Sequence, residues 1–381
     1  MSGNKIYLDY AAATPVNDQV LKTMEPYFSD RFYNPSSKYS EGIEIYKQIE
    51  STRFKIASIL LVKSDEIYFT AGGTEANNLA ISGVMEQNPG KNIIISAIEH
   101  ESISDTAKKF KYKIAPVDSS GRIIVTKLKE LIDKDTVLIS VMYANNEIGT
   151  IQPLSDIKKL ILQVRKDRIR SKNKLPLYFH SDACQAANYL SLNASGLGLD
   201  LMTLNGGKIY GPKQSGCLFI HRNVKLSPQI LGGGQEKGVR SGTENVPAII
   251  GFGNALELAN RLKNDESKRL VTLRDYLAES LLSTVNGCSI NGSKKNRLPN
   301  NLNVSFKDQD NEAMLFKLDQ NGVMCSTGSA CSAQKDTISP TLLAIGLSEN
   351  QALSSLRFSL GRKTTKQQIE KTVEIIQKIL S

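Results

Sequence analysis

At 381 residues the chain is too long for one small hydrophobic core, so we expect two domains. No apolar run approaches the length of a membrane span, and the N-terminal residues contain no signal-peptide core, so we expect a cytoplasmic protein without membrane association. The net charge of +10 comes from scattered basic residues, apart from a modest run at 158–174, and no aromatic-rich RNA-reading motif occurs. Direct nucleic-acid binding is therefore not expected.

Cysteine and histidine usage limits the chemistry further. The five cysteines are odd in number and form no C-x-x-C pattern, which argues against a disulfide framework and the common zinc sites. Only three histidines occur, so no metal site is expected.

The N-terminal part of the chain predicts a short strand at Ile6–Tyr10, helices near 16–27 and 41–61, and a strand at Ile67–Thr70. The motif A-G-G-T-E-A follows that strand, and small or apolar residues then recur at helical spacing. Gly73 and Thr74 therefore stand where a helix begins, and its free N–H groups favour an anion such as phosphate. A plain helix capped by the threonine explains this motif equally well.

Three buried strands follow, at Asn92–Ala97, Val137–Tyr143 and Leu177–His180, separated by helical segments. This alternation predicts a parallel α/β sheet, in which ligands bind beyond the carboxyl ends of the strands. A lone histidine or aspartate there would more often be structural. Together, however, the polar residues after these strands and after Ile67–Thr70 are expected to converge on one crevice: Thr74, His100, Asn146, Asp182 and Gln185.

The next motif, L-N-G-G-K-I-Y-G-P-K, holds Lys208 among glycines and ends at a proline that fixes the turn. A buried strand, Gly216–Ile220, follows. A lysine on a tight turn between strands can point into a cleft, lose its proton more easily and form a Schiff base. The alternative for this motif alone is a lysine on a solvent-facing turn.

Beyond the Gly-rich loop Leu231–Thr243, helices at 247–261 and 267–282 lead towards a second domain. This region continues with a strand at Leu302–Phe306, a loop of small residues from Met324 towards Pro340, and a strand at Ser355–Arg362. An amphipathic helix follows from about residue 365.

The crevice residues and the lysine together match the needs of pyridoxal phosphate. The cofactor needs a phosphate cup, a Schiff-base lysine and an aspartate, here Asp182, that keeps the ring nitrogen protonated. Gln185 is placed to donate to the phenolic oxygen, and His100 to stack on the ring and move protons. Arg357 suits a substrate carboxylate, which its guanidinium binds bidentately.

Among the cysteines, Cys331 stands in T-G-S-A-C-S-A, where small neighbours leave a thiol accessible. An accessible cysteine with thiolate character is a nucleophile, and the alternative is an inert turn of small residues. Apolar or strand-like neighbours indicate structural roles for Cys184, Cys217 and Cys288. Cys325 fits either role.

Ten motifs in one order extend over nearly the whole chain: YLDYAAATP, NPSS, AGGTEANN, IEHES, NNEIGT, DACQ, KIYGPK, GGGQEKGVRSGT, TGSACSA and LRFSLGR. In these the chain resembles the cysteine desulfurases of the NifS/IscS type, within the class-V aminotransferases. The resemblance implies an α/β protein of the pyridoxal-phosphate-dependent transferase fold type I. A mostly parallel seven-stranded sheet would lie in a large cofactor-binding domain at 17–256. A smaller α/β domain built from both termini, 1–16 and 257–381, would carry the nucleophilic cysteine.

The resemblance also implies roles for the site residues. Catalysis would fall to Lys208, His100 and Cys331, and substrate binding to Asn146 and Arg357. Thr243 would reach the phosphate of the partner subunit, which implies a homodimer. The cofactor would be bound by Gly73, Thr74, His100, Asn146, Asp182, Gln185, Asn205, Gly207, Lys208 and Thr243.

The reaction implied by the resemblance starts when L-cysteine displaces Lys208 from the cofactor. Lys208 removes the Cα proton, the Cys331 thiolate attacks the substrate sulfur, and L-alanine leaves. Cys331 then carries a persulfide for a sulfur-acceptor protein, either an iron–sulfur scaffold or a tRNA-thiolating enzyme.

One departure from the family concerns the residues before Lys208. The family has Ser-x-His there, and this chain has Asn205, Gly206 and Gly207. Asn205 can still donate to a phosphate, whereas Gly207 has no imidazole. We therefore predict weaker cofactor retention without loss of activity.

Two other functions compete with cysteine desulfuration. One is a selenocysteine lyase or another class-V enzyme, although Cys331 argues against an ordinary aminotransferase. The other is a noncatalytic basic scaffold protein, against which Lys208, Asp182, His100 and Cys331 argue together.

Overall fold

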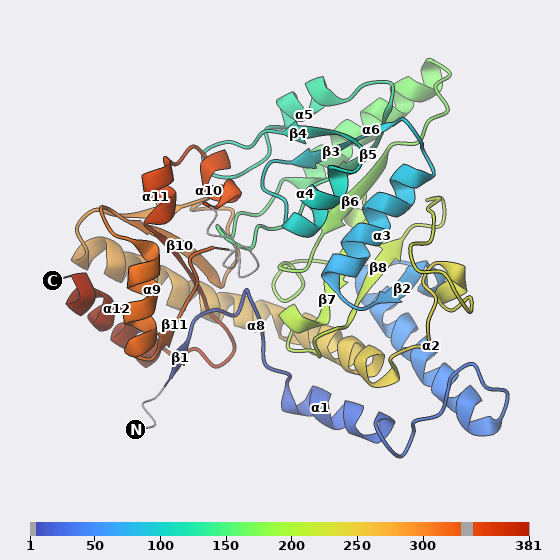
Figure 1. Ribbon diagram of the computed structural model, residues 1–381, viewed down its shortest axis with the longest axis horizontal. Coiled ribbons are helices and arrows are strands. Elements are labelled where there is room, and N and C mark those ends of the chain that lie inside the picture. Colours follow the sequence, from blue (N-terminus) through green and yellow to red (C-terminus); the bar gives the residue numbers. More distant parts are fainter. Residues whose placement is uncertain (1–4, 329–337, 381) are drawn as a thin grey trace.

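Two lobes of unequal size make up the molecule, and one long helix, α8 (Val246–Thr284), runs along both of them (Figure 1). The computed structural model describes residues 5–328 and 338–380. Cys331 lies outside these ranges. None of the helices in the described ranges is long and apolar enough to cross a membrane.

The larger lobe is built on a seven-stranded sheet. Along the chain its strands are β2 (Ile67–Thr70), β3 (Asn92–Ser96), β4 (Lys111–Ala115), β5 (Thr136–Ser140), β6 (Tyr178–Asp182), β7 (Leu201–Asn205) and β8 (Gly216–Ile220). Their spatial order is β2-β8-β7-β6-β5-β3-β4, and β8 is antiparallel to both of its neighbours while all other pairs are parallel. This confirms the mostly parallel sheet that the sequence predicts.

Helices cover both faces of this sheet. They are α1 (Asp18–Met24), α2 (Ser40–Leu60), α3 (Gly73–Glu86), α4 (Glu101–Ala107), α5 (Val125–Leu131), α6 (Leu154–Arg170) and α7 (Ala194–Leu197). Strand β3 shows why its residues form a central strand: Ile93 and Ile95 pack into a cluster with α3 and α4, and Ile94 packs on the other face with α2 and α6. Because side chains alternate along a strand, an uninterrupted apolar run suits a strand that is covered on both faces.

The smaller lobe joins the two ends of the chain. Strand β1 (Ile6–Tyr7) pairs in parallel with β11 (Val323–Met324). Beside this pair lies an antiparallel sheet in the order β12-β10-β9, made of β9 (Cys288–Asn291), β10 (Asn301–Phe306) and β12 (Ser355–Ser359). The helices of this lobe are α9 (Asn311–Gln320), α10 (Pro340–Ala344), α11 (Glu349–Leu353) and α12 (Lys366–Leu380).

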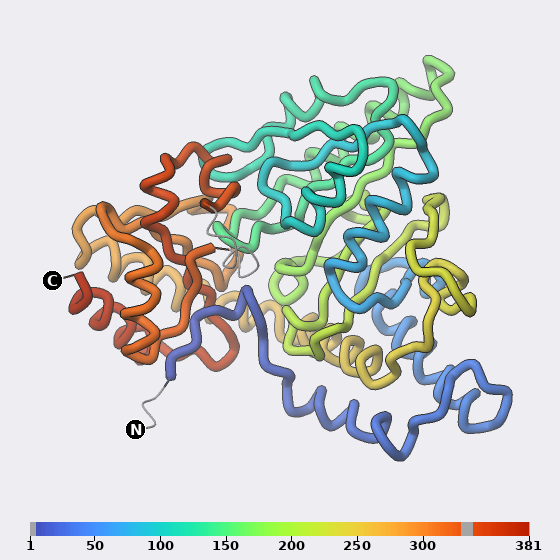
Figure 2. The backbone as a smooth tube through the Cα atoms, in the orientation of Figure 1, coloured from blue at the N-terminus to red at the C-terminus, as the bar shows by residue number. Residues whose placement is uncertain are grey.

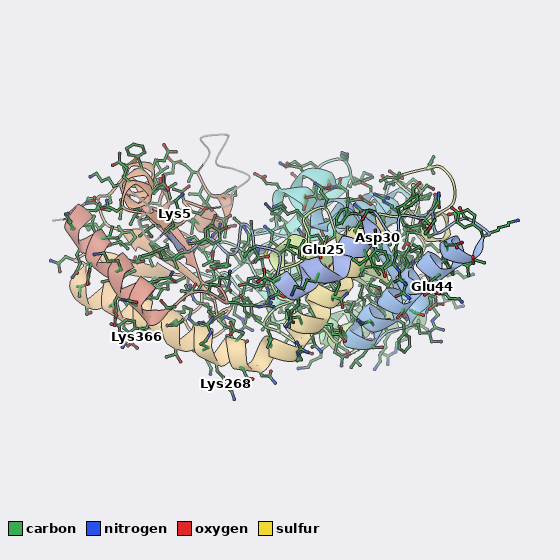
Figure 3. All side chains as sticks on the ribbon, turned by 90° about the horizontal axis from the view of Figure 1, so that it is seen from below. Lys5, Glu25, Asp30, Glu44, Lys268 and Lys366 are labelled. Carbon is green, nitrogen blue, oxygen red and sulfur yellow. The ribbon has the colours of Figure 1, made fainter. Side chains whose placement is uncertain are left out.

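Helix α8 corrects one expectation from the sequence, which divided this region into two helices. Residues 262–266 contain neither glycine nor proline, so nothing in the chain stops the first helix before the second begins. Its first half packs Phe252 and Leu256 into the core of the large lobe, and its second half packs Leu277 and Leu281 into the core of the small lobe. Seen from below, α8 forms the base of the molecule, with Lys268 exposed near its middle (Figure 3).

The N-terminal segment passes from the small lobe to the large one (Figure 2). It leaves β1, crosses the space between the lobes and reaches α1 on the large lobe. The division at residues 17–256 stays a prediction, and its second boundary falls inside α8.

Candidate active site

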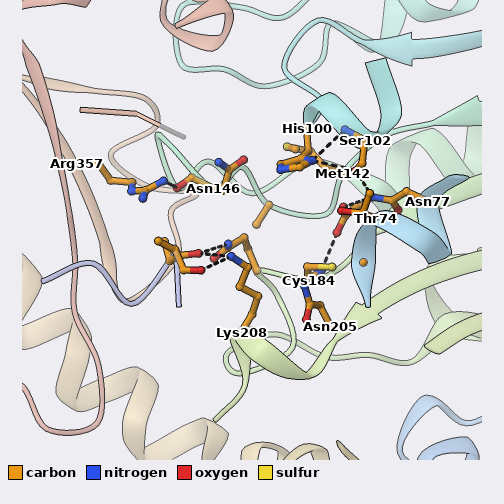
Figure 4. Close-up of a pocket in the computed structure, with 16 residues that line it drawn as sticks. Thr74, Asn77, His100, Ser102, Met142, Asn146, Cys184, Asn205, Lys208 and Arg357 are labelled. Atoms are coloured by element: carbon orange, nitrogen blue, oxygen red, sulfur yellow. Dashed lines mark hydrogen bonds between the residues drawn. The ribbon is translucent and has the colours of Figure 1, made fainter. Parts of the chain in front are cut away.

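One pocket brings together most of the side chains that the sequence predicts for the site (Figure 4). It lies at the carboxyl ends of the large-lobe strands and is closed on one side by the small lobe. The predicted residues that line it are Gly73, Thr74, His100, Asn146, Asp182, Gln185, Asn205, Lys208 and Arg357.

The N-terminus of α3 forms one end of the pocket. Gly216 of β8 pairs with Thr70 of β2 on one side and with Asn205 of β7 on the other. A Cβ atom at Gly216 would lie 2.4 Å from the Leu204 carbonyl oxygen, so only glycine permits this close approach of the strands. The register therefore brings the start of α3 beside Asn205.

Two backbone donors at this end are left for a ligand by the described part of the chain. Gly72 precedes α3 with a φ of 132° and caps the helix with no side-chain hydrogen bond. In the part of the chain that the structure describes, the N–H groups of Gly73 and Thr74 have no hydrogen-bond acceptor. Three features therefore suit an anion: these N–H groups, the positive end of the helix dipole, and the Thr74 hydroxyl.

Asp182 ends strand β6 on the floor of the pocket, where two donors fix its carboxylate. The Asn77 Nδ2 donates to Oδ2 over 2.7 Å, and the backbone N–H of Cys184 donates to Oδ1 over 2.9 Å. Asn77 also donates to the Ser102 hydroxyl, which joins α3 to α4. We did not predict Asn77 from the sequence, although it follows Thr74 by three residues and so shares its helix face.

His100 caps the N-terminus of α4. Its Nδ1 accepts a hydrogen bond from the backbone N–H of Ser102 over 3.1 Å. The proton of the neutral imidazole therefore sits on Nε2, because Nδ1 is occupied as an acceptor. The ring lines the pocket between the α3 end and Asn146.

Lys208 lies on a short 3₁₀ turn, Gly206–Lys208, at the end of β7. Its Nζ donates to the carbonyl oxygens of Ala11, over 3.0 Å, and Ala12, over 2.5 Å. Gln185 Nε2 donates to the same Ala11 oxygen over 3.0 Å. The N-terminal segment thus holds the amine inside the pocket, and the alternative of a solvent-facing turn lysine is wrong for this chain.

Arg357, on β12 of the small lobe, forms the opposite end of the pocket and is 1% exposed. Its Nη2 donates to Asp9 Oδ1 over 2.7 Å, and its Nη1 donates to the Asn146 carbonyl oxygen over 3.2 Å. Among the described residues, its Nε finds no hydrogen-bond partner. Sequence reasoning did not single out Asp9, whose contact with Arg357 joins positions 348 residues apart.

Glu147 ties this end to the small lobe. Its carboxyl accepts from the Ser339 hydroxyl over 2.5 Å, just before α10. Burial raises the pKa of Glu147, against the opposing effects of Ser339 and Arg357. The contact joins the loop after β5 to the chain on the far side of the segment that contains Cys331.

Three predicted residues are not placed in the pocket. Gly207 lies on an adjoining groove together with Asn205 and Lys208. Thr243 is exposed and lines a separate cavity with Gln214. The position of Cys331 is outside the described residues.

Cys184 lines the pocket although we predicted only a structural role for it. Burial, and next the Asp182 carboxylate, raise the pKa of its thiol well above the ordinary value. The thiol therefore stays protonated, and a structural role remains the better interpretation.

Comparison with known proteins identifies the family. The family described as Aminotransferase class-V matches residues 6–372. The chain belongs to the class-V aminotransferases.

Its relatives within this family include named cysteine desulfurases. The chain is 42% identical to the cysteine desulfurase IscS of Dictyoglomus turgidum, over 99% of this chain and 94% of the relative. Among solved structures it is similar to a NifS-like protein, with a TM-score of 0.90 at 33% identity over 99% of each chain. It is also similar to SspA in complex with cysteine, with a TM-score of 0.81 at 34% identity over 93% of this chain and 98% of the other.

Class-V aminotransferases depend on pyridoxal phosphate, and the donor set of this pocket fits that group. A phosphate is matched by the α3 N–H groups, which lack acceptors, and by the Thr74 hydroxyl. A protonated ring nitrogen is matched by the Asp182 carboxylate, and an aldehyde by the Lys208 amine.

Proposed function

We propose that the chain is a pyridoxal-phosphate-dependent cysteine desulfurase, which converts L-cysteine to L-alanine and holds the sulfur as a persulfide on Cys331. The observation that carries this proposal is the arrangement of one pocket. An amine, a carboxylate and an anion-binding helix end stand at one side, and a buried guanidinium stands at the other. A cofactor phosphate and an amino-acid carboxylate can be bound at the two ends together.

The residues that would hold the cofactor follow from the donor set. Lys208 would hold it covalently, Asp182 would pair with the ring nitrogen, and Gly73, Thr74 and Asn205 would bind the phosphate. Gln185 and His100 line the same space. When bound, pyridoxal phosphate supplies an electron sink for the charge that deprotonation leaves on the substrate Cα.

Arg357 and Asn146 orient the substrate in this mechanism. The guanidinium has an Nε–H for which residues 5–328 and 338–380 offer no acceptor, so it can donate to a carboxylate without losing Asp9. Arg357 and Lys208 line the same pocket, so the Cα of a substrate whose carboxylate is held at Arg357 would lie between them, and Lys208 Nζ would accept the Cα proton. His100 can hold or release a proton at Nε2.

Cys331 completes the reaction by taking the sulfur. Its thiolate forms an S–S bond with the substrate sulfur while the substrate C–S bond breaks. The electron pair of the broken bond is protonated, and alanine results. The role of Cys331 rests on the resemblance to NifS/IscS enzymes and on the chemistry of an accessible thiolate.

Product analysis of three proteins tests this function. Wild-type protein with pyridoxal phosphate and dithiothreitol should form alanine and sulfide from L-cysteine in equal amounts. Lys208→Ala should form neither, and Cys331→Ala should form no protein persulfide. The matched control is Cys288→Ala, which alters another thiol of the small lobe and should keep full activity. Normal sulfur transfer by Cys331→Ala would overturn the assignment of the nucleophile.

We further propose a homodimer, in which Thr243 of one subunit contacts the cofactor phosphate in the other subunit. Two observations support it. Thr243 is exposed and lies outside the pocket of its own chain. Large aromatic side chains are exposed on α2 and on the segment before it, among them Phe28, Phe32 and Phe54 at 64%, 68% and 67%. Burial of these rings against a second subunit would remove their apolar surface from water.

Light scattering of the intact protein tests the dimer. Phe54→Asp should shift the mass towards the monomer and weaken cofactor binding with it. A wild-type mass of one chain would exclude this proposal.

The remaining proposals concern location and partners. We propose that the protein acts in the cytoplasm and passes sulfur to acceptor proteins, either an iron–sulfur scaffold or a tRNA-thiolating enzyme. Affinity capture on protein loaded with persulfide at Cys331, against unloaded protein, identifies the acceptor. Capture of the same proteins by both forms would contradict a persulfide-dependent partner.

A further inference from the structure

Gly207 leaves room for a side chain that the chain does not have. A Cβ atom built there would lie 3.5 Å from Asn205 Oδ1 and 3.6 Å from Lys213 Cγ, which are ordinary contact distances. The backbone of Gly207 is not left-handed, so any residue could adopt it. The position is thus an open space beside the α3 end, with the Lys213 side chain along one edge.

This space belongs to a groove that adjoins the pocket. Gly73 and Thr74 of α3 line the groove, together with Asn205 and Lys213. The N–H groups at the start of α3, which lack acceptors, and the Lys213 side chain therefore border one cavity. Asn205 Oδ1 is occupied by the Gly207 N–H over 2.9 Å, so only its Nδ2 remains as a donor to a ligand.

Lys213 is held at this groove by a fixed turn, and its charge is not neutralised there. The Ser215 hydroxyl donates to the Pro212 carbonyl oxygen over 2.6 Å, which orders the turn that carries the lysine. The acidic residue of the groove, Glu75, is already paired with Arg240 over 2.9 Å. Lys213 forms no ion pair with any residue in the described ranges.

We propose that Lys213 binds the phosphate at the cofactor site. Gly207 has no side chain that could supply positive charge there, and the Lys213 ammonium supplies it instead. The inference rests on the proposed function, because it concerns the phosphate of pyridoxal phosphate. A lysine is suited to this task because its ammonium is a compact charge on a flexible stem. The Lys213 Cγ lies 3.6 Å from the place where a Cβ atom of residue 207 would be, and two further methylene groups of this exposed side chain join Cγ to the ammonium.

The affinities of pyridoxal phosphate and pyridoxal, which lacks the phosphate, test the proposal on full-length protein freed of cofactor. Absorbance titration gives the Kd of each ligand. Lys213→Gln should raise the Kd of pyridoxal phosphate by about tenfold or more, since a charge-assisted contact to the phosphate is lost. The Kd of pyridoxal should not change. Lys213→Arg, which keeps the charge, should recover most of the loss. The matched control is Lys268→Gln on the exposed side of α8, which should change neither Kd.

Gly207→His gives a second measurement in the same space. An imidazole there should also bind the phosphate. Lys213→Gln should therefore raise the Kd of pyridoxal phosphate less in the Gly207→His protein than in the wild type. Wild-type affinity should also fall with added salt more steeply than that of Lys213→Gln.

Two outcomes overturn the inference, and they separate it from the proposed function. If Lys213→Gln leaves the Kd of both ligands unchanged, or raises both equally, Lys213 does not bind the phosphate. The proposed desulfuration of L-cysteine is not contradicted by that result. If wild-type protein binds neither ligand and forms no alanine from L-cysteine, the proposed function fails together with the inference.

Discussion

The two ends of the pocket are built in opposite ways (Figure 4). At the α3 end, backbone N–H groups have no acceptor among the residues that the structure describes, so an anion can bind without displacing any of these residues. At the other end, a buried guanidinium is compensated by Asp9 and by the Asn146 carbonyl oxygen. An uncompensated buried charge is costly, so this end needs its own counter-charge when substrate is absent.

The difference suggests that the two ends can be changed separately. The α3 end belongs to the large lobe, and Arg357 belongs to the small lobe. A change at one end should alter cofactor affinity, and a change at the other should alter substrate affinity. Arg357→Ala and Thr74→Val test this division, whereas Glu236→Ala and Glu99→Gln test buried carboxylates that line neither end. The four variants follow from the largest expected effect to the smallest.

Glu236→Ala should cause the largest loss, because it removes the ion pair that fastens the glycine-rich loop beside the cofactor end. Nη1 and Nη2 of Arg53 each donate to Glu236 over 2.7 Å, and the Phe69 N–H donates to it over 2.8 Å. Removing one partner of a buried pair costs about 3–5 kcal/mol of unfolding free energy. Urea denaturation measures the loss, and Glu236→Gln, which keeps the shape, should lose less. A change below about 1 kcal/mol would mean that the pair is not effectively buried.

Arg357→Ala should lower kcat/KM for L-cysteine by about 100-fold, the size expected when hydrogen bonds to a charged group are lost. The loss should appear in KM, since the guanidinium binds the carboxylate both before and during the reaction. The Kd of pyridoxal phosphate should stay constant. Steady-state kinetics and a cofactor titration check both statements. Equal losses of kcat/KM and of cofactor affinity would contradict the proposed separation of the two ends.

Glu99→Gln should flatten the dependence of stability on pH without altering either end. The Glu99 Oε1 accepts from the Ser96 hydroxyl and from the Met142 N–H, and the buried Oε2 has no partner in the described ranges. Burial raises its pKa to about 8 from an ordinary value of 4.5. The folded protein therefore keeps a proton that the unfolded chain has lost, and stability falls as pH rises towards 8.

His180 sets the pH window for this measurement. Burial lowers the pKa of His180 to about 4 from 6.5, so below pH 6.5 its effect on stability runs in the opposite direction. Between pH 6.5 and 8 the wild type should lose about 1–2 kcal/mol relative to Glu99→Gln. Parallel pH profiles of the two proteins in urea denaturation would contradict the shifted pKa.

Thr74→Val should have the smallest effect, because it removes one hydroxyl and keeps the side-chain shape. The backbone donors of α3 remain, so the Kd of pyridoxal phosphate should rise by about fivefold. The KM for L-cysteine at saturating cofactor should not change. A larger effect on KM than on the cofactor Kd would place Thr74 at the substrate instead.

The sequence predicted those parts of the site that depend on local patterns. Apolar runs located the strands, and the rule that ligands lie beyond their carboxyl ends brought together Thr74, His100 and Asp182. The sequence patterns did not predict Asp9 and Asn77, because the roles of these two residues depend on the docking of separate elements. The pairing of Asp9 with Arg357 exists only when the N-terminal segment lies across β12. The single helix α8 was missed because loop-like polarity at 262–266 also suits an exposed helix surface.

The N-terminal segment has a consequence for the order in which the protein matures during synthesis. Ile6 pairs with Val323 and Asp9 with Arg357, so the first strand to be translated is held by parts of the chain that are made last. A nascent chain can complete the seven-stranded sheet long before β12 leaves the ribosome. Until then Arg357 is absent and the substrate end of the pocket does not exist. The enzyme therefore cannot bind its amino-acid substrate productively while it is still being translated.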